Sequence, residues 1–132
     1  MDKTMVKIRE AEQTDVEPIR ELIEYLMKVE ETDDVEWNTE TIMRDRIIPS
    51  FGSETSKTFV ATLDEKIVGA QLVEIKNNLV ASLAYIAVAP DHQGSGIGSK
   101  LIKASEEYAK NKGIHIVQTI VHKDNEKSKE FH

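Results

Sequence analysis

Residues 88–101, VAPDHQGSGIGSKL, decide the fold of this chain of 132 residues. The almost uncharged run Ala81–Ala89 leads into this stretch and predicts a strand that is buried on both faces. From Ile97 to Lys112 the apolar side chains recur at helical spacing, and Gly113 follows as a typical C-terminal glycine. The stretch therefore predicts a buried strand, a glycine-rich loop and an amphipathic helix in direct succession.

The glycine-rich loop is typical of an anion site made by the backbone. Its glycines, at positions 94, 96 and 98, allow positive φ angles and a close approach of a ligand. The first N–H groups of the following helix lack intrahelical acceptors and lie at the positive end of the helix dipole. We therefore expect a phosphate group here, with the Ser99 hydroxyl beside it.

Two common nucleotide motifs do not match this loop. The spacing G-x-G-x-G differs from the dinucleotide fingerprint G-x-G-x-x-G, and Gly98-Ser99-Lys100 reverses the Lys-Ser/Thr order of a P-loop. A nucleotide-binding protein that uses the same loop stays open as an alternative, and it predicts affinity for ATP or NAD comparable to that for another phosphate ligand.

The remaining periodicities predict one α+β domain over residues 1–132, with a mixed, mostly antiparallel central sheet flanked by helices. The expected order is β-α-α-β-β-β-α-β-α. A helix capped by Thr14 or Asp15 follows the first strand, and Pro49 ends a second, shorter helix. Asp64-Glu65-Lys66 predicts a tight hairpin turn. The predicted strands are Met5–Arg9, Thr58–Leu63, Ile67–Ile75, Ala81–Ala89 and Ile114–Val121, and a last helix spans Asn125–His132.

The composition excludes several classes of protein. With 17 basic and 24 acidic side chains the net charge is −7, which disfavours nucleic acid as a partner. The absence of cysteine excludes disulfides and thiolate chemistry, and the histidine spacing predicts no metal site. No apolar run approaches the ~20 residues of a membrane span, so we expect a cytoplasmic protein that does not enter a membrane.

Two motifs in this chain resemble those of the GNAT N-acetyltransferase superfamily. The segment Gln93–Gly98 is similar to the family's acetyl-coenzyme A signature Q/R-x-x-G-x-G/A. About thirty residues later, Asn125-x-x-Ser128-x-x-Phe131-His132 is similar to its N-x-x-A/S-x-x-F/L-Y helix. The resemblance covers nearly the whole chain and implies the acyl-CoA N-acyltransferase fold, with acetyl-coenzyme A as the acetyl donor and a primary amine as the acceptor.

The resemblance also implies roles for individual residues. The buried strand would offer its backbone to the pantetheine arm at Ile86, Ala87 and Val88, and Asn125 and Ser128 would contact the cofactor from the last helix. The pyrophosphate would lie against the loop amides of Gln93, Gly94, Ser95, Gly96, Ile97 and Gly98, with Ser99 beside them. The amine would attack the thioester directly in a ternary complex.

The catalytic carboxylates of the family are not evident in this chain. Ser82 and Ile120 occupy the two positions at which branches of the family place a glutamate base. The family's acidic tyrosine aligns with His132, which is a candidate proton donor. Tyr85 and Glu74 are the other polar candidates near the expected cleft, with a packing role also open for Tyr85 and a solvent-facing strand position also open for Glu74.

The acceptor and the activity leave two further questions. Five carboxylates within Glu30–Glu36 lie where the family walls its acceptor site, which favours a cationic amine, either small or on a peptide. The missing carboxylates favour, as the alternative to an enzyme, a coenzyme A-binding sensor or subunit without turnover. Because family members continue past Phe131-His132, we expect either a truncated domain or a homodimer in which another chain completes the sheet.

Overall fold

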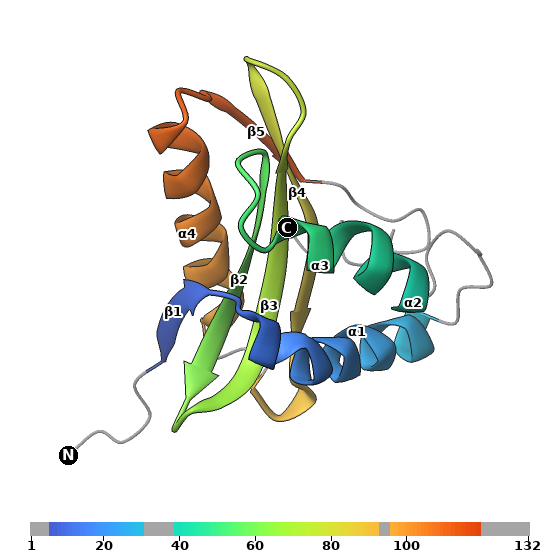
Figure 1. The fold of residues 1–132 in the computed structure, drawn as a ribbon. Helices are drawn as coiled ribbons and strands as arrows, with labels where there is room; N and C mark the ends of the chain where they lie inside the picture. The colour runs from blue at the N-terminus through green and yellow to red at the C-terminus, as the bar shows by residue number, and fades with distance from the viewer. Residues whose placement is uncertain (1–5, 31–38, 93–95, 120–132) are drawn as a thin grey trace.

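The computed structural model describes residues 6–30, 39–92 and 96–119. Five strands form one sheet, with helices on both faces (Figure 1). The strands are β1 (Lys7–Glu10), β2 (Ser56–Leu63), β3 (Lys66–Ile75), β4 (Val80–Val88) and β5 (Ile116–Thr119). The α-helices are α1 (Val16–Glu30), α2 (Thr39–Ile42), α3 (Ile48–Ser50) and α4 (Ile97–Asn111); a π-helical turn, η3 (Met43–Ile47), joins α2 to α3, and 3-10 turns span Gln13–Asp15 and Pro90–His92.

The sheet has the order β1-β2-β3-β4-β5, and its first four strands are antiparallel. Strand β5 pairs with β4 in parallel after the α4 crossover. The predicted α+β fold with a mixed, mostly antiparallel sheet is therefore confirmed. The last predicted helix, Asn125–His132, and the last two residues of the predicted strand Ile114–Val121 lie outside the described residues; β5 begins at Ile116, two residues later than predicted, and Ile114 is buried against the end of α4.

The predicted hairpin turn between β2 and β3 is confirmed. Leu63 pairs with Lys66, and the two residues between them have positive φ angles, 53° at Asp64 and 68° at Glu65. Two successive left-handed residues are the geometry of a type I′ turn, whose twist matches that of the flanking strands.

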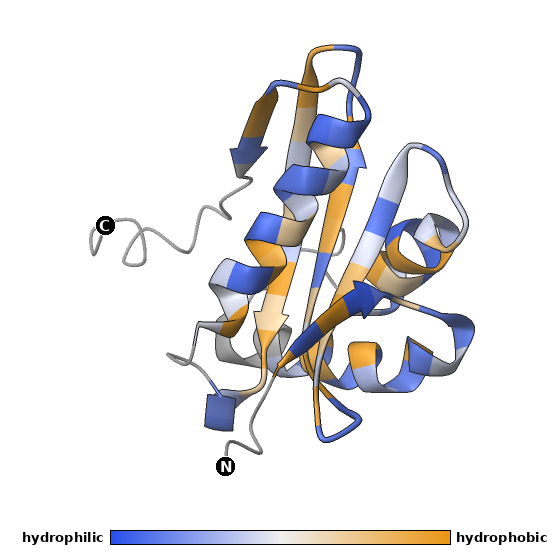
Figure 2. Ribbon diagram, turned by 90° about the vertical axis from the view of Figure 1, so that its left-hand side faces the viewer, coloured by the Kyte–Doolittle hydropathy of each residue, from blue (hydrophilic) through white to orange (hydrophobic). Residues whose placement is uncertain are grey.

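Helices α1 and α2–α3 cover one face of the sheet, and α4 covers the other (Figure 1). On the first face, Ile19 and Ile23 of α1 and Ile42 and Ile47 of the second helical segment are almost completely buried against Leu72. On the second face, α4 packs on the sheet through Ile97, Leu101 and Ala109. Figure 2 shows hydrophobic residues on the central strands and hydrophilic ones on the outward side of α4. Burial of each large aliphatic side chain contributes about 1.5–3 kcal/mol.

Two helix boundaries differ from the predictions. The carboxylate of Asp15 accepts the Glu12 N–H at 2.7 Å, so the cap belongs to the 3-10 turn that precedes α1. Pro49 lies inside α3, and the buried Ser50 hydroxyl donates to the Ile47 carbonyl at 2.5 Å and pairs with the Thr58 hydroxyl at 2.6 Å. This buried pair ties the end of the helical segment to β2.

A β-bulge interrupts the pairing of β3 and β4. Leu72 pairs with Tyr85 and Val73 with Leu83, which leaves Ala84 as the extra residue. The bulge reverses the alternation of β4, because Leu83 faces the α4 side whereas Tyr85 faces α1. Among the described helices, none is both long and apolar enough to cross a membrane.

Candidate active site

The N-terminus of α4 is arranged to receive an anion. Gly96 is its N-cap, with φ +84°, and no side chain caps the helix. Because the Lys100 N–H donates to the Gly96 carbonyl at 3.1 Å, the earlier N–H groups of Ile97, Gly98 and Ser99 have no acceptor within the helix. Among the described residues beyond its chain neighbours, none has an atom within 4 Å of a Cβ added at Gly96.

The charges around this helix end support the same conclusion. The first turn of α4 contains no acidic residue, whereas the first turns of α1 and α2 contain Glu17 and Glu40. An acid in the first turn would stabilise the helix but would compete with a bound anion. Of the loop residues predicted to bind pyrophosphate, Gly96, Ile97, Gly98 and Ser99 are described and form this helix end; Gln93, Gly94 and Ser95 lie outside the described residues.

Strand β4 presents an edge next to this helix end. The Ala89 N–H donates to the Val68 carbonyl at 2.8 Å, toward β3, and backbone groups alternate along a strand. The backbone of Ala87 therefore also faces β3, whereas Ile86 and Val88 direct theirs to the opposite edge. On that edge β5, which is described as far as Thr119, pairs with Val80–Leu83.

A close contact sets the position of α4 on the sheet. A Cβ on Gly69 of β3 would lie 3.0 Å from Ile97 Cγ2 and 3.2 Å from Leu101 Cδ1. Only glycine therefore lets the first turns of α4 approach β3 this closely. The same approach brings Gly98 beside Ile86, where an added Cβ would lie 3.8 Å from Ile86 Cδ1. The anion-binding helix end and the β4 edge are thus held side by side.

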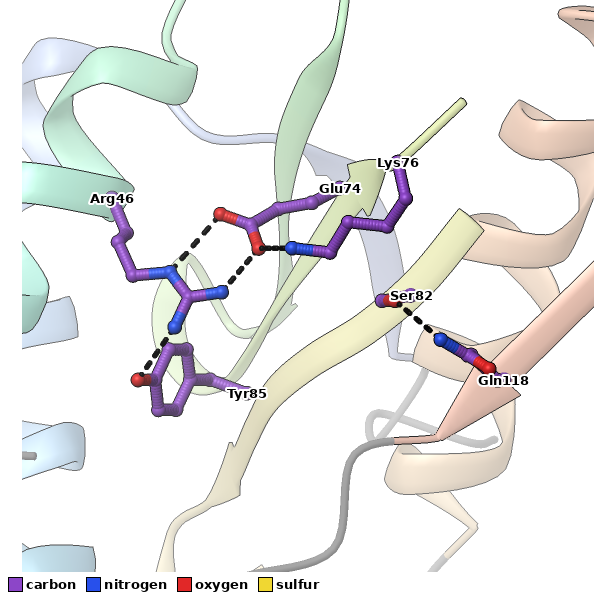
Figure 3. Close-up of polar contacts among 6 residues, drawn as sticks. All are labelled: Arg46, Glu74, Lys76, Ser82, Tyr85 and Gln118. Carbon is purple, nitrogen blue, oxygen red and sulfur yellow. Dashed lines mark hydrogen bonds and ion pairs between the residues drawn. The ribbon is translucent and has the colours of Figure 1, made fainter. Parts of the chain in front are cut away.

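A polar cluster lies on the α1 side of the sheet, next to the bulge of β4 (Figure 3). Arg46 of the π-helical turn donates from Nε to Glu74 Oε2 at 3.1 Å, from Nη2 to Glu74 Oε1, and from Nη1 to the Tyr85 hydroxyl at 2.9 Å. Its guanidinium carbon also lies 4.9 Å from the centre of the Tyr85 ring. Lys76 Nζ approaches Glu74 Oε1 at 3.2 Å, so two cations share one carboxylate.

The electrostatics of this cluster keep Glu74 ionised. Burial acts to raise the pKa of Glu74, but the hydrogen bonds and charges of Arg46 and Lys76 outweigh burial, and the pKa lies below its ordinary value. The hydrogen bond to Glu74 is the largest of the effects that raise the pKa of Arg46. Glu74 is therefore a structural anion rather than a ready proton acceptor.

These contacts change the interpretation of two residues and add a third. Glu74, for which the sequence leaves open both a place near the cleft and a solvent-facing position, has a side chain only 17% exposed and paired with Arg46. Tyr85 is buried among apolar residues, as a packing role requires, yet its hydroxyl is also hydrogen-bonded. Sequence reasoning missed Arg46. Its signal is position, since it follows Ile42 and Met43 by four and three residues and so lies on the apolar face of the helix.

Ser82, where one branch of the family places a glutamate, is fully buried and accepts a hydrogen bond of 3.3 Å from Gln118 of β5 (Figure 3). The pair joins β4 to β5 next to the last described pair of the two strands, Leu83 and Thr119. The other such position, Ile120, and the predicted site residues Asn125, Ser128 and His132 lie outside the described residues.

Comparisons with known proteins agree with this geometry. No curated protein sequence matches the chain. Among solved structures it is similar to the aminoglycoside N-acetyltransferase AAC(6')-Iy in complex with coenzyme A, with a TM-score of 0.77, 20% identity, and coverage of 99% of this chain and 86% of that one. It is also similar to the PaiA N-acetyltransferase from Thermoplasma acidophilum in complex with coenzyme A, with a TM-score of 0.77, 21% identity, and coverage of 96% and 86%.

A transcriptional regulator from Bacillus halodurans C-125 is similar as well, with a TM-score of 0.73, 23% identity, and coverage of 96% of this chain and 89% of that one. The family model for the acetyltransferase (GNAT) family matches residues 19–132, which include α4, β4 and the polar cluster. The chain therefore belongs to the GNAT acetyltransferase family, whose acetyl donor is acetyl-coenzyme A.

Proposed function

We propose that this protein transfers the acetyl group of acetyl-coenzyme A to a primary amine, by direct attack of the amine in a ternary complex. The observation that carries the proposal is the N-terminus of α4, which begins at Gly96 without a side-chain cap among the described residues and lies beside Ile86 of β4. The names of two similar structures, both N-acetyltransferases, support an amine as the acceptor.

In this proposal the chain binds its donor at three places. The N–H groups of Gly96–Ser99, together with Gln93, Gly94 and Ser95, hold the pyrophosphate. The pantetheine arm lies along the segment 86–88 of β4 as an added strand, and it pairs with the outward backbone groups of Ile86. Asn125 and Ser128 contact it from the C-terminal segment.

The chemistry in this proposal depends on positioning and on proton transfer. Backbone donors at the β4 edge would polarise the thioester carbonyl, and binding would hold the neutral amine against its carbon. The departing sulfur takes a proton from Tyr85 or His132. A single domain spanning residues 1–132, a cytoplasmic location and a homodimer remain predictions.

The acceptor is proposed to be a cationic amine, drawn by the carboxylates of Glu30–Glu36. Neutral amides at Glu30, Glu31, Asp33, Asp34 and Glu36 should raise the KM for the amine. An unchanged KM for the best amine would show that this segment is only solvated surface.

Binding of the donor is tested by Gly96→Glu, which places a carboxylate before the helix end and should abolish acetyl-coenzyme A binding in calorimetry. Gly113→Glu is the matched control, because Gly113 has φ +83°, has no atom within 4 Å of an added Cβ and follows the other end of α4. Both variants carry a similar backbone strain of about 1–2 kcal/mol. Equal affinities in the two variants would place the donor elsewhere.

Turnover is tested by release of free thiol with a panel of primary amines. The competing proposal, a coenzyme A-binding sensor or subunit without turnover, is favoured by the neutral Ser82 and the ion-paired Glu74. Tight acetyl-coenzyme A binding with no thiol release from any amine would establish that alternative and end the enzyme proposal.

A further inference from the structure

We propose that Arg46 is a positioning residue for acetyl transfer, which orients the Tyr85 hydroxyl and makes that phenol a competent proton donor to the departing thiolate. The inference rests on the proposed function, because it assigns a partner to a reaction that the protein must first be shown to perform.

Contacts with Glu74 and Tyr85 hold the guanidinium of Arg46 in place. Its fork is occupied by Glu74, while Nη1 reaches the Tyr85 hydroxyl at 2.9 Å. Its plane also lies near the ring, 4.9 Å from guanidinium carbon to centroid. The π-helical turn supplies the side chain from α2–α3, Glu74 comes from β3 and Tyr85 from β4, so three elements converge. A π-helical turn costs helix stability and is frequent at functional sites.

Tyr85 stands at the point where the chemistry is expected. It is the first residue after the bulge at Ala84, and it lies two positions beyond Leu83, which pairs with Thr119 of β5. The next residue, Ile86, directs its backbone to the edge where the donor is proposed to bind. A proton donor at Tyr85 would therefore lie beside the thioester end of the pantetheine arm.

The chemistry explains why such a phenol needs a guanidinium. The pKa of an ordinary phenol is about 1.5 higher than that of an ordinary thiol, so a phenol would protonate a thiolate poorly. A hydrogen bond donated to the phenolic oxygen, together with an adjacent positive charge, favours the phenolate and removes this mismatch.

The proposed step balances its atoms and protons. The amine nitrogen forms a bond to the carbonyl carbon, the carbon–sulfur bond breaks, and the sulfur takes the Tyr85 proton. The proton that the nitrogen then loses returns to the phenolate, so Tyr85 ends each turnover as it began. No oxidant or metal takes part in this balance.

The described charged groups around Tyr85 come from two elements. Arg46 faces it from the π-helical turn, and Glu74 with its partner Lys76 lies on β3. From α1 the neighbouring side chain is the apolar Ile23, which together with Ile47 lines a void of about 10 Å³ beside the ring. Among these described groups, Arg46 donates a hydrogen bond to the phenol, and Glu74 offsets its positive charge.

This arrangement predicts that two substitutions, each of which replaces a charged side chain by a neutral one, shift the basic limb of the kcat–pH profile in opposite directions. Tyr85 must be protonated to donate, so kcat falls as pH rises through its titration. Arg46→Met removes the positive charge, should lower kcat about tenfold, and should move the basic limb of the pH profile to higher pH. Glu74→Gln leaves Arg46 uncompensated and should move the same limb to lower pH. Arg46→Lys keeps the charge and should keep the limb near that of the wild type.

The controls separate this role from a structural one. Arg44→Met removes the neighbouring arginine of the same turn, whose side chain is 71% exposed, and should leave kcat and the limb unchanged. Tyr85→Phe should lower kcat by about 100-fold, and Arg46→Met should then cost less than a further twofold. Additive losses in the double variant, or basic limbs that move in the same direction in Arg46→Met and Glu74→Gln, would overturn the proposal.

A measurement without turnover keeps the two proposals distinguishable. When tyrosine is labelled with ¹³C at Cζ, the three tyrosines give one signal each, and the signal that is missing in Tyr85→Phe belongs to Tyr85. The Tyr85 signal should titrate at higher pH in Arg46→Met and at lower pH in Glu74→Gln. If these shifts occur but no amine is acetylated, the proposed function fails alone; if transfer occurs without them, the role of Arg46 fails.

Discussion

Gly69→Ala tests whether the close approach of α4 to the sheet controls both stability and donor binding. The new methyl carbon would lie 3.0 Å from Ile97 Cγ2, 3.2 Å from Leu101 Cδ1 and 3.4 Å from the Ala87 carbonyl oxygen. Favourable contacts between carbon atoms lie at about 3.5–4.0 Å, so the first turns of α4 would have to move by several tenths of an ångström.

The expected cost follows from two opposing effects. Replacing a glycine within a strand by alanine restores about 0.5–1 kcal/mol of backbone entropy. Inserting a methyl group into a packed core costs about 1–3 kcal/mol. We therefore expect a net loss of about 1–2 kcal/mol in the free energy of unfolding, measured by urea denaturation. Because Ile97 is the first residue of α4, acetyl-coenzyme A should also bind about three- to tenfold more weakly in calorimetry.

A double-mutant cycle provides the control. Ile97→Ala alone should cost about 2–4 kcal/mol through its cavity, and the Gly69→Ala methyl should fill part of that cavity in the double variant. The sum of the losses in unfolding free energy of the two single variants should then exceed the loss measured in the double variant. If Gly69→Ala is as stable as the wild type, or if the losses are additive, the close contact does not position α4.

Three other predictions concern single contacts. The pKa of Asp15 is lowered, chiefly by its hydrogen bonds with Arg9 at 2.8 and 3.1 Å. The ionised Asp15 therefore stabilises the fold above the ordinary aspartate pKa, and this stabilisation is lost as pH falls. In Asp15→Asn, the free energy of unfolding measured in urea should fall less steeply between about pH 5 and 2 than in the wild type. Ser105→Ala leaves the buried Gln71 amide oxygen without its 2.9 Å partner and should cost about 1–3 kcal/mol in urea denaturation, whereas the double variant with Gln71→Leu should recover most of the loss. The methyl group of Gly98→Ala would meet only Ile86 Cδ1, at an ordinary 3.8 Å, so this variant should raise thermal stability. Its acetyl-coenzyme A affinity should change by less than twofold, because only the backbone amide of residue 98 is expected to bind the donor. A large loss of affinity would contradict this.

The fold was largely predictable because its main signals are local. The glycine loop and the periodicity of Ile97–Lys112 predicted α4, and Asp64-Glu65 predicted the hairpin that pairs β2 with β3. The bulge at Ala84 was not predictable, because Ala81–Ala89 is apolar throughout and no alternation marks which residue changes face. Local sequence thus predicted the elements but not the pairing irregularity between them.

The site was predictable in the same uneven way. The open end of α4 follows from the sequence, since glycine at the N-cap and the absence of a first-turn acid are both local features. Arg46 and Tyr85 are 39 residues apart, and their contact exists only once α2–α3 packs on β4. The two interpretations of Glu74 could not be separated from the sequence, because a carboxylate in a strand looks solvated until its guanidinium partner is known.

The bulge in β4 has a consequence for folding fidelity. On its N-terminal side, Leu83 belongs to the α4 core, and on its C-terminal side, Tyr85 belongs to the α1 core. If the β3–β4 hairpin closed one residue out of register, Leu83 and Tyr85 would each face the opposite helical layer, and the Tyr85 hydroxyl would lose its hydrogen bond with Arg46. A misregistered hairpin would therefore disturb the packing of both helical layers at once, so the bulge favours the native alignment.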